Sequence, residues 1–116
     1  MDLNEMKVGD LLKLVGLLNA RQSDHPFVGR YVICRCYSAG VHAGELVSQI
    51  GDQAVLKDSR RLWSWQVREG IALSGLAVHG LKSGKVDSQV AEIALTGVIE
   101  TIPCSKEAER TIRECK

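Results

Sequence analysis

Residues 38–65 read SAGVHAGELVSQIGDQAVLKDSRRLWSW, and this stretch decides the fold of the chain. Gly51 and Asp52 stand between two segments, residues 45–50 and 53–57, that have the composition of β-strands. A two-residue connection with glycine is typical of a tight hairpin, because glycine adopts the backbone conformations that such turns require. We therefore predict an antiparallel pair of strands over residues 45–57.

Further strands are predicted on both sides of this hairpin. Residues 27–36 are rich in Val, Ile and Tyr, and residues 60–65 have the pattern of a short strand or an extended edge. Residues 90–102 alternate well enough for one long strand, which Pro103 would end. Residues 81–88 are polar and contain glycine, so we predict a loop there, and the most mobile segment of the chain.

Three helices complete the pattern. Apolar residues recur at helical spacing within residues 1–21, although Gly9 and Gly16 weaken this prediction. A short helix over residues 72–79 would end at Gly80 in the left-handed conformation. The last helix would cover residues 105–115, with Ser105 as its N-cap.

The predicted fold class is α+β, with a small antiparallel sheet, an N-terminal amphipathic helix, a short middle helix and a C-terminal helix. A chain of 116 residues has the length of one domain. Residues 1–26 would form the N-terminal helix and a linker, because Pro26 disfavours helical geometry at the residue before it. Residues 27–116 would form a single ligand-binding domain.

Charge and hydropathy exclude several classes of protein. A formal net charge of +1 gives no broad attraction to duplex nucleic acid, so DNA binding is disfavoured as the main function. No segment has the roughly 18 uninterrupted apolar residues of a membrane span, and the N-terminus lacks the basic start of a secretory signal. We therefore expect a cytosolic protein whose four cysteines are thiols. Cys34 and Cys36 would share one face of a strand as buried residues.

Two features of the opening stretch suit an anionic, aromatic ligand such as a nucleotide. Residues 38–44 are predicted to form a glycine-flanked turn. Backbone N–H groups that are exposed beside glycines can bind a phosphate. Residues 60–65 place Arg60 and Arg61 beside Trp63 and Trp65, so a guanidinium and an indole would be available together. The two arginines point to opposite faces of a strand, and only one of them can share a ligand pocket.

The candidate ligand-binding residues follow from these features and from the last helix. They are Gly40, Val41, His42, Ala43, Arg60, Arg110 and Arg113. Each has a simpler interpretation: the turn could merely join two strands, the histidine could be solvated, and at least one tryptophan is expected in the core. Arg110 and Arg113 could pair with Glu107 and Glu109 at helical spacing.

Catalytic and metal-binding motifs are missing from the sequence. No nucleophile elbow, ordered triad, P-loop or H-E-x-x-H motif is present, and Cys34-x-Cys36 has no second ligand pair at zinc spacing. We therefore assign no catalytic residue, no metal ligand and no cofactor, and expect binding without turnover.

The segments YSAGVHAGELVS, KDSRRLWSW and IALTGVIETIPCS are similar to a family of small phage-encoded proteins, the first-described Thoeris anti-defence proteins. The resemblance covers residues 30–105. It implies a sponge in the host cytoplasm that binds immune signals, mainly cyclic ADP-ribose isomers and in some members cyclic oligonucleotides, without cleaving them. It also implies a symmetric homo-oligomer, a dimer or a hexamer built from dimers.

The resemblance also implies roles for the candidate residues. Gly40, Val41, His42 and Ala43 would hold cyclic nucleotides near a junction between subunits. Arg110 and Arg113 match the C-terminal arginine pair that holds the ADP-ribose pyrophosphate. The N-terminal helix and residues 66–70 depart from the family pattern, and the choice of ligand stays open for that reason.

Two other functions stay open on the residues alone. The protein could be an enzyme that degrades such a nucleotide, with His42 or His79 as general acid or base. It could also be a structural or regulatory interaction module without a small ligand, in which the apolar N-terminal helix docks a partner.

Overall fold

The computed structural model describes residues 25–116. The order of elements is β1 (Tyr31–Cys36), β2 (Gly40–Ile50), β3 (Gln53–Val67), α2 (Ala72–His79), β4 (Leu81–Val86), β5 (Val90–Thr96), β6 (Val98–Pro103) and α3 (Lys106–Glu114). All strand pairs are antiparallel, so this part of the chain is a six-stranded antiparallel sheet with two helices. The predicted N-terminal helix lies outside the described residues.

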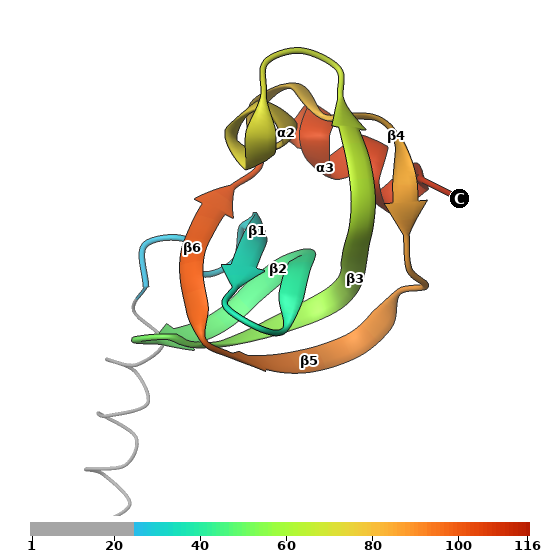
Figure 1. The fold of residues 1–116 in the computed structure, drawn as a ribbon. Helices are drawn as coiled ribbons and strands as arrows, with labels where there is room; N and C mark the ends of the chain where they lie inside the picture. The colour runs from blue at the N-terminus through green and yellow to red at the C-terminus, as the bar shows by residue number, and fades with distance from the viewer. Residues whose placement is uncertain (1–24) are drawn as a thin grey trace, which may run out of the picture.

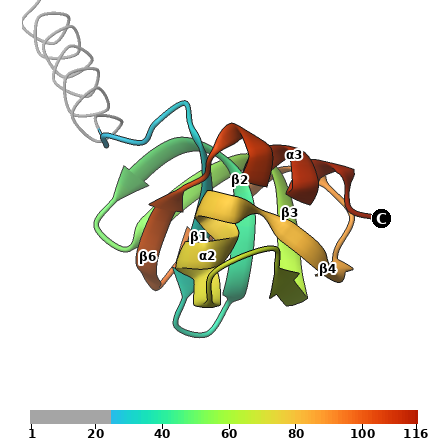
Figure 2. The same ribbon diagram turned by 90° about the horizontal axis from the view of Figure 1, so that it is seen from above.

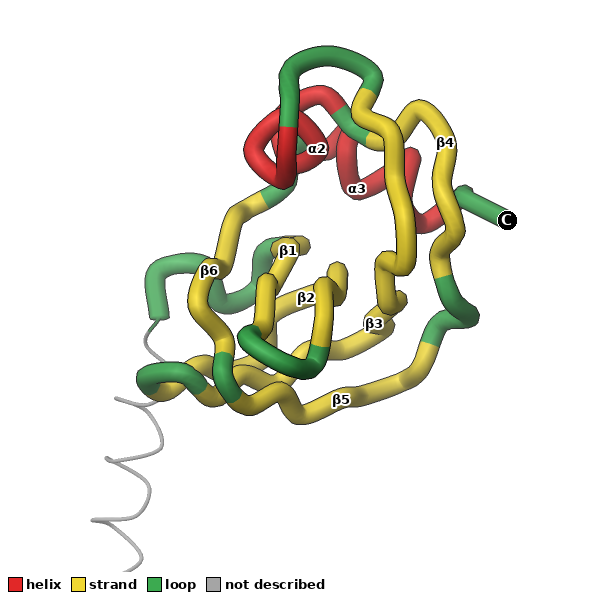
Figure 3. Tube along the Cα trace, in the orientation of Figure 1, coloured by secondary structure: helices red, strands yellow, loops and turns green. Residues whose placement is uncertain are grey.

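The sheet is strongly curled, and β5 runs across its lower side in Figure 1. β2 lies between β1 and β3, β5 pairs with the first half of β3, and β6 pairs with β1. β5 and β6 are separated by Gly97 alone, so together they lead the chain from β3 back to β1. Both helices lie on one side of this curl (Figures 2 and 3).

Two hydrophobic clusters fill the two faces of the sheet. The helix-side core lies between the sheet and both helices, and comprises Tyr31, Ile33, Ala43, Leu62, Leu73, Leu76, Ala77, Leu81, Cys104, Ala108 and Ile112. The inner core lies on the other face, and comprises Val32, Cys34, Cys36, Leu46, Ala54, Leu56, Leu95 and Val98. Because side chains alternate along a strand, β1 contributes to both cores and is buried on both faces.

Several predictions from the sequence are confirmed. Ile50 pairs with Gln53 across the hairpin at Gly51 and Asp52. The short helix ends at Gly80, whose φ is 93°. The hydroxyl of Ser105 caps α3 by accepting a hydrogen bond from the Ala108 amide at 3.1 Å.

The cysteine prediction is also confirmed. Cys34 and Cys36 lie together in the inner core, and all four cysteines are free thiols. Burial raises the pKa of Cys34 to about 11, so this group stays protonated at neutral pH.

Several boundaries were predicted wrongly. The strand expected from residue 45 begins at Gly40, and residues 53–57 and 60–65 belong to one long strand, β3. The first strand starts at Tyr31 rather than at residue 27, because the chain turns over residues 26–29. The expected long strand over residues 90–102 is two strands, since Gly97, with φ 79°, redirects the chain from β3 to β1.

The loop predicted over residues 81–88 is also wrong. Most of this segment is β4, which pairs with the end of β3. Gly84 serves close packing there: a Cβ built on it would lie 2.3 Å from the Ser64 carbonyl oxygen. The glycine that suggested a loop is needed because two strands approach closely at this point.

Replacing Gly84 by alanine should therefore destabilise the protein. The new methyl group must displace the β3 backbone, and overpacking of this kind costs about 1–3 kcal/mol. Urea denaturation measures the loss, with Lys82→Ala on the exposed part of the same strand as the control. Equal stability of the two variants would show that β4 does not pack as described.

Candidate functional site

The turn predicted over residues 38–44 is shorter in the structure, because most of that stretch belongs to β2. The turn covers residues 37–39, and Gly40 already begins β2. Val41, His42 and Ala43 pair with β1 on one side and with β3 on the other. The prediction of a nest of bare amides is therefore wrong, because two ladders of backbone hydrogen bonds occupy this stretch.

The side chains of these four residues separate instead of converging. Ala43 is fully buried in the helix-side core, and Gly40 is exposed at the start of the strand. Val41 lines a hollow of about 330 Å³ together with Trp65 and the start of α2. His42, at 1% exposure, faces the opposite side of the sheet from Ala43 and lines a small cavity.

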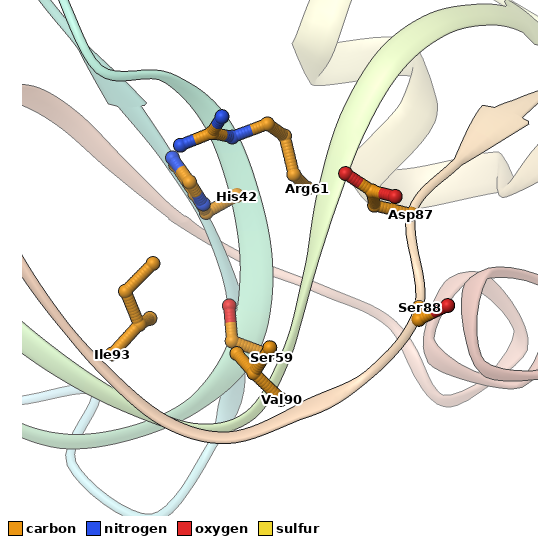
Figure 4. Close-up of a pocket in the computed structure, with 7 residues that line it drawn as sticks. All are labelled: His42, Ser59, Arg61, Asp87, Ser88, Val90 and Ile93. Atoms are coloured by element: carbon orange, nitrogen blue, oxygen red, sulfur yellow. The ribbon is translucent and has the colours of Figure 1, made fainter.

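This cavity, here called the His42 cavity, is the strongest candidate site. It has a volume of about 150 Å³ and lies where β2, β3, β5 and the β4–β5 connection meet (Figure 4). Its lining is His42, Ser59, Arg61, Asp87, Ser88, Val90 and Ile93. His42 and Arg61 are direct partners in the β2–β3 ladder, so both side chains point to the same face.

The imidazole of His42 has a defined hydrogen-bond state. Nε2 lies 2.8 Å from the Ala39 carbonyl oxygen, which can only accept, so Nε2 carries the proton and donates it. Burial lowers the pKa of His42; the Ala39 hydrogen bond opposes this shift, and the Arg61 cation adds to it. At neutral pH the ring is therefore uncharged, and Nδ1 is an acceptor.

Arg61 is the cation of the cavity. Within residues 25–116 its guanidinium forms no hydrogen bond and no ion pair, and it lies 5.4 Å from the centre of the Trp63 ring. Trp63 is 62% exposed, and its indole Nε1 donates to the Asp87 carboxylate at 3.0 Å. This hydrogen bond lowers the pKa of Asp87 and holds the carboxylate ionised.

Ser59 supplies a buried hydroxyl without a partner. The residue is 1% exposed, and its Oγ makes no hydrogen bond to any described residue. In Figure 4 this oxygen points towards the side of the cavity that holds His42 and Arg61. A buried hydroxyl without a partner is unusual in a folded protein, and it marks a place where a ligand or ordered water can bind.

Arg60, the arginine that we predicted as ligand-binding, has a structural role. It pairs with Ala43 in the ladder and so faces the helices rather than the cavity. Its guanidinium donates to the carbonyl oxygens of Asp87, Ile112 and Cys115 at 2.8, 2.7 and 2.6 Å. With 8% of its surface exposed, Arg60 is a buried clamp on the end of α3.

Arg110 and Arg113 lie on α3, away from the His42 cavity. Together with Lys106 and Glu109 they line an open hollow of about 430 Å³, which shares no residue with that cavity. Arg110 forms ion pairs with Glu107 and Glu114, and Arg113 pairs with Glu109 at 2.8 Å. The glutamate pairing that the sequence allowed is thus formed.

The sequence missed Ser59, Arg61 and Asp87 as members of one site. The register between β2 and β3 could have revealed this site. One of the adjacent residues Arg60 and Arg61 must face the same side as His42, and the hairpin at residues 51–52 determines which one. A β-bulge makes this register hard to predict from the sequence. Asp58 has a positive φ of 52°, and the pairing of β2 with β3 shifts between Ala43 and Glu45.

Metal sites and membrane spans are not found in the described part of the chain. Within residues 25–116 no three His, Cys, Asp or Glu residues are grouped closely enough to hold a metal ion. In the same residues, neither helix has the length and apolar character that crossing a membrane requires.

Comparison with known proteins places the chain in a family. No curated protein and no solved structure is significantly similar to it. The model of a domain of unknown function, DUF6948, matches residues 29–112, which include every strand and nearly all of α3. The chain therefore belongs to the DUF6948 family.

Proposed function

We propose that the protein binds an anionic nucleotide signal at the His42 cavity and holds it without cleaving it. The observation that carries this proposal is the Arg61 guanidinium, which lines the cavity and forms no direct ion pair or hydrogen bond within residues 25–116. A half-buried guanidinium with no direct ion pair has its donors free for a phosphate, which accepts charge-assisted hydrogen bonds from it.

Trp63 supports an aromatic ligand. Its ring has Arg61 on one face, and the hydrogen bond to Asp87 fixes its orientation although the side chain is largely exposed. A flat surface that is already held in place loses little entropy when a nucleobase stacks on it. Phosphate and base would thus be bound by residues two positions apart on β3.

The size of the cavity limits how much of the ligand is enclosed. Pockets for whole ligands measure about 300–1,000 Å³, whereas the His42 cavity measures about 150 Å³. Only a phosphate-sized part of a nucleotide fits inside, and the remainder would lie against Trp63 and a second copy of the chain. Sedimentation equilibrium with and without ligand measures whether copies associate.

The hydrogen-bonding states of Ser59 and His42 support binding of the ligand without its cleavage. A serine nucleophile is activated by a hydrogen bond to a base, whereas the Ser59 hydroxyl donates to no described residue. His42 uses Nε2 for Ala39 and is uncharged. Sequestration requires a slow dissociation rate and no chemistry.

The hollow on α3 is a second candidate surface for the pyrophosphate of an ADP-ribose ligand. Lys106, Arg110 and Arg113 give it three cations. A ligand there must first displace Glu107, Glu109 and Glu114 from the arginines. Replacing Arg110 by methionine separates the two surfaces, because binding at the His42 cavity would be unchanged in this variant.

Calorimetry with cyclic ADP-ribose isomers and with cyclic di- and trinucleotides tests the proposed function. We expect at least one of them to bind, and mass spectrometry of the ligand released by heating should return it intact. New products after incubation would instead identify a degrading enzyme. No binding of any of these compounds, at protein concentrations well above micromolar, would refute the proposal.

A further inference from the structure

The charged side chains of the His42 cavity limit the charge of the ligand group that it can bind. The lining has one positive side chain, Arg61, and one negative side chain, Asp87, while His42 is uncharged. Arg61 is the one cation of this lining and can balance one negative charge on a ligand, whereas the Asp87 carboxylate repels a second or third. This favours a singly charged group over a terminal triphosphate.

The hydrogen-bonding groups form a complementary set. Arg61 and the unpaired hydroxyl of Ser59 are donors, and Nδ1 of His42 is an acceptor. A ligand that satisfies all three must present acceptor oxygens next to a hydroxyl. A phosphate with its own hydroxyl meets this requirement, and so does a phosphodiester beside a ribose hydroxyl.

The volume of the His42 cavity also favours a phosphate group. A cavity of about 150 Å³ has the space of about five waters, at roughly 30 Å³ for each water in the liquid. A phosphate group has five non-hydrogen atoms and fits, whereas a purine has about twice as many and does not.

We propose that the His42 cavity holds one singly charged phosphate group, with Arg61 and Ser59 donating to its oxygens and Nδ1 of His42 accepting from an adjacent hydroxyl. The inference rests on the proposed function, because it states which part of the nucleotide is buried. It also extends that function: inorganic phosphate and simple phosphate esters should compete for the same cavity.

Ser59→Ala is the test variant. It removes an unpaired buried hydroxyl and only one atom, so the free protein should fold and be at least as stable as the wild type. Ser83→Ala, on the exposed part of β4, is the matched control. The probes are inorganic phosphate, adenosine monophosphate and cyclic di-AMP, which represent free phosphate, a monoester and a diester. At about pH 6 a singly charged form of each phosphate is populated.

The expected result is mutual competition of the three probes in calorimetry. Each should bind about tenfold more weakly to Ser59→Ala and with unchanged affinity to Ser83→Ala, since one charge-assisted hydrogen bond is lost. Added phosphate should also shift the Nδ1 resonance of His42 in nitrogen NMR.

Two other outcomes separate this inference from the proposed function. If cyclic nucleotides bind wild type and Ser59→Ala equally and phosphate does not compete, the inference is overturned and sequestration stands. If phosphate binds and Ser59→Ala weakens it, but no nucleotide binds, the inference stands and sequestration is overturned.

Discussion

Replacing Arg61 by methionine is expected to weaken nucleotide binding about 100-fold, because at least two charge-assisted hydrogen bonds to the ligand are lost. Methionine keeps the apolar stem of the side chain and removes only the guanidinium. Within residues 25–116 that guanidinium makes no hydrogen bond or ion pair, so its removal leaves no partner unsatisfied. The fold should therefore be unaffected.

Calorimetry on the wild type, Arg61→Met and Arg68→Met measures this effect. Arg68 is the control because it directly follows the same strand, lies outside the His42 cavity and forms an exposed ion pair with Glu107. The control should bind like the wild type. Equal affinity of Arg61→Met and Arg68→Met would place the binding site elsewhere, with the hollow on α3 as the next candidate.

Replacing Arg60 by methionine is expected to lower the free energy of unfolding by about 3–5 kcal/mol, because buried carbonyl groups lose a charged donor. Three of these carbonyls belong to Ile112, Arg113 and Cys115 at the end of α3, and the other two to Val86 and Asp87. The last carbonyls of a helix have no partner within the helix, and the negative end of its dipole favours a cation. Arg60 supplies both the donors and the charge.

Urea denaturation measures the loss, with Arg110→Met as the control. Arg110 forms two exposed ion pairs on α3, and pairs of this kind contribute about 0–1 kcal/mol. Arg60→Lys is a second variant for the case in which the methionine variant does not fold. It keeps the charge but cannot reach all of the carbonyls, so an intermediate stability is expected. A decrease in the free energy of unfolding below about 1 kcal/mol for Arg60→Met would contradict a stabilising role of Arg60 at the end of α3.

These two variants also separate neighbouring residues that look equivalent in the sequence. Arg60 and Arg61 differ only in which face of β3 they occupy, and we predicted Arg60 as the ligand-binding one. The alternation along a strand correctly predicts that only one can share a pocket. It does not say which, because the answer depends on the register with β2 and on the bulge at Asp58.

Local patterns in the sequence determined the elements whose cause is local. The hairpin at Gly51 and Asp52, the cap at Ser105 and the end of α2 at Gly80 each depend on a few adjacent residues, and all three are confirmed. The pairing of Glu107 and Glu109 with the arginines of α3 is of the same kind, since helical spacing alone brings these side chains together.

Only the tertiary structure decided the features that need two distant segments. Gly84 suggested a loop by composition, yet it lies in a strand because the β3 backbone occupies the space of a side chain. The His42 cavity combines residues of β2, β3, β5 and the connection after β4, and no local sequence pattern relates these segments. A chain specifies its turns and caps through neighbouring residues, whereas a cavity exists only after strands distant in the sequence have paired in one register.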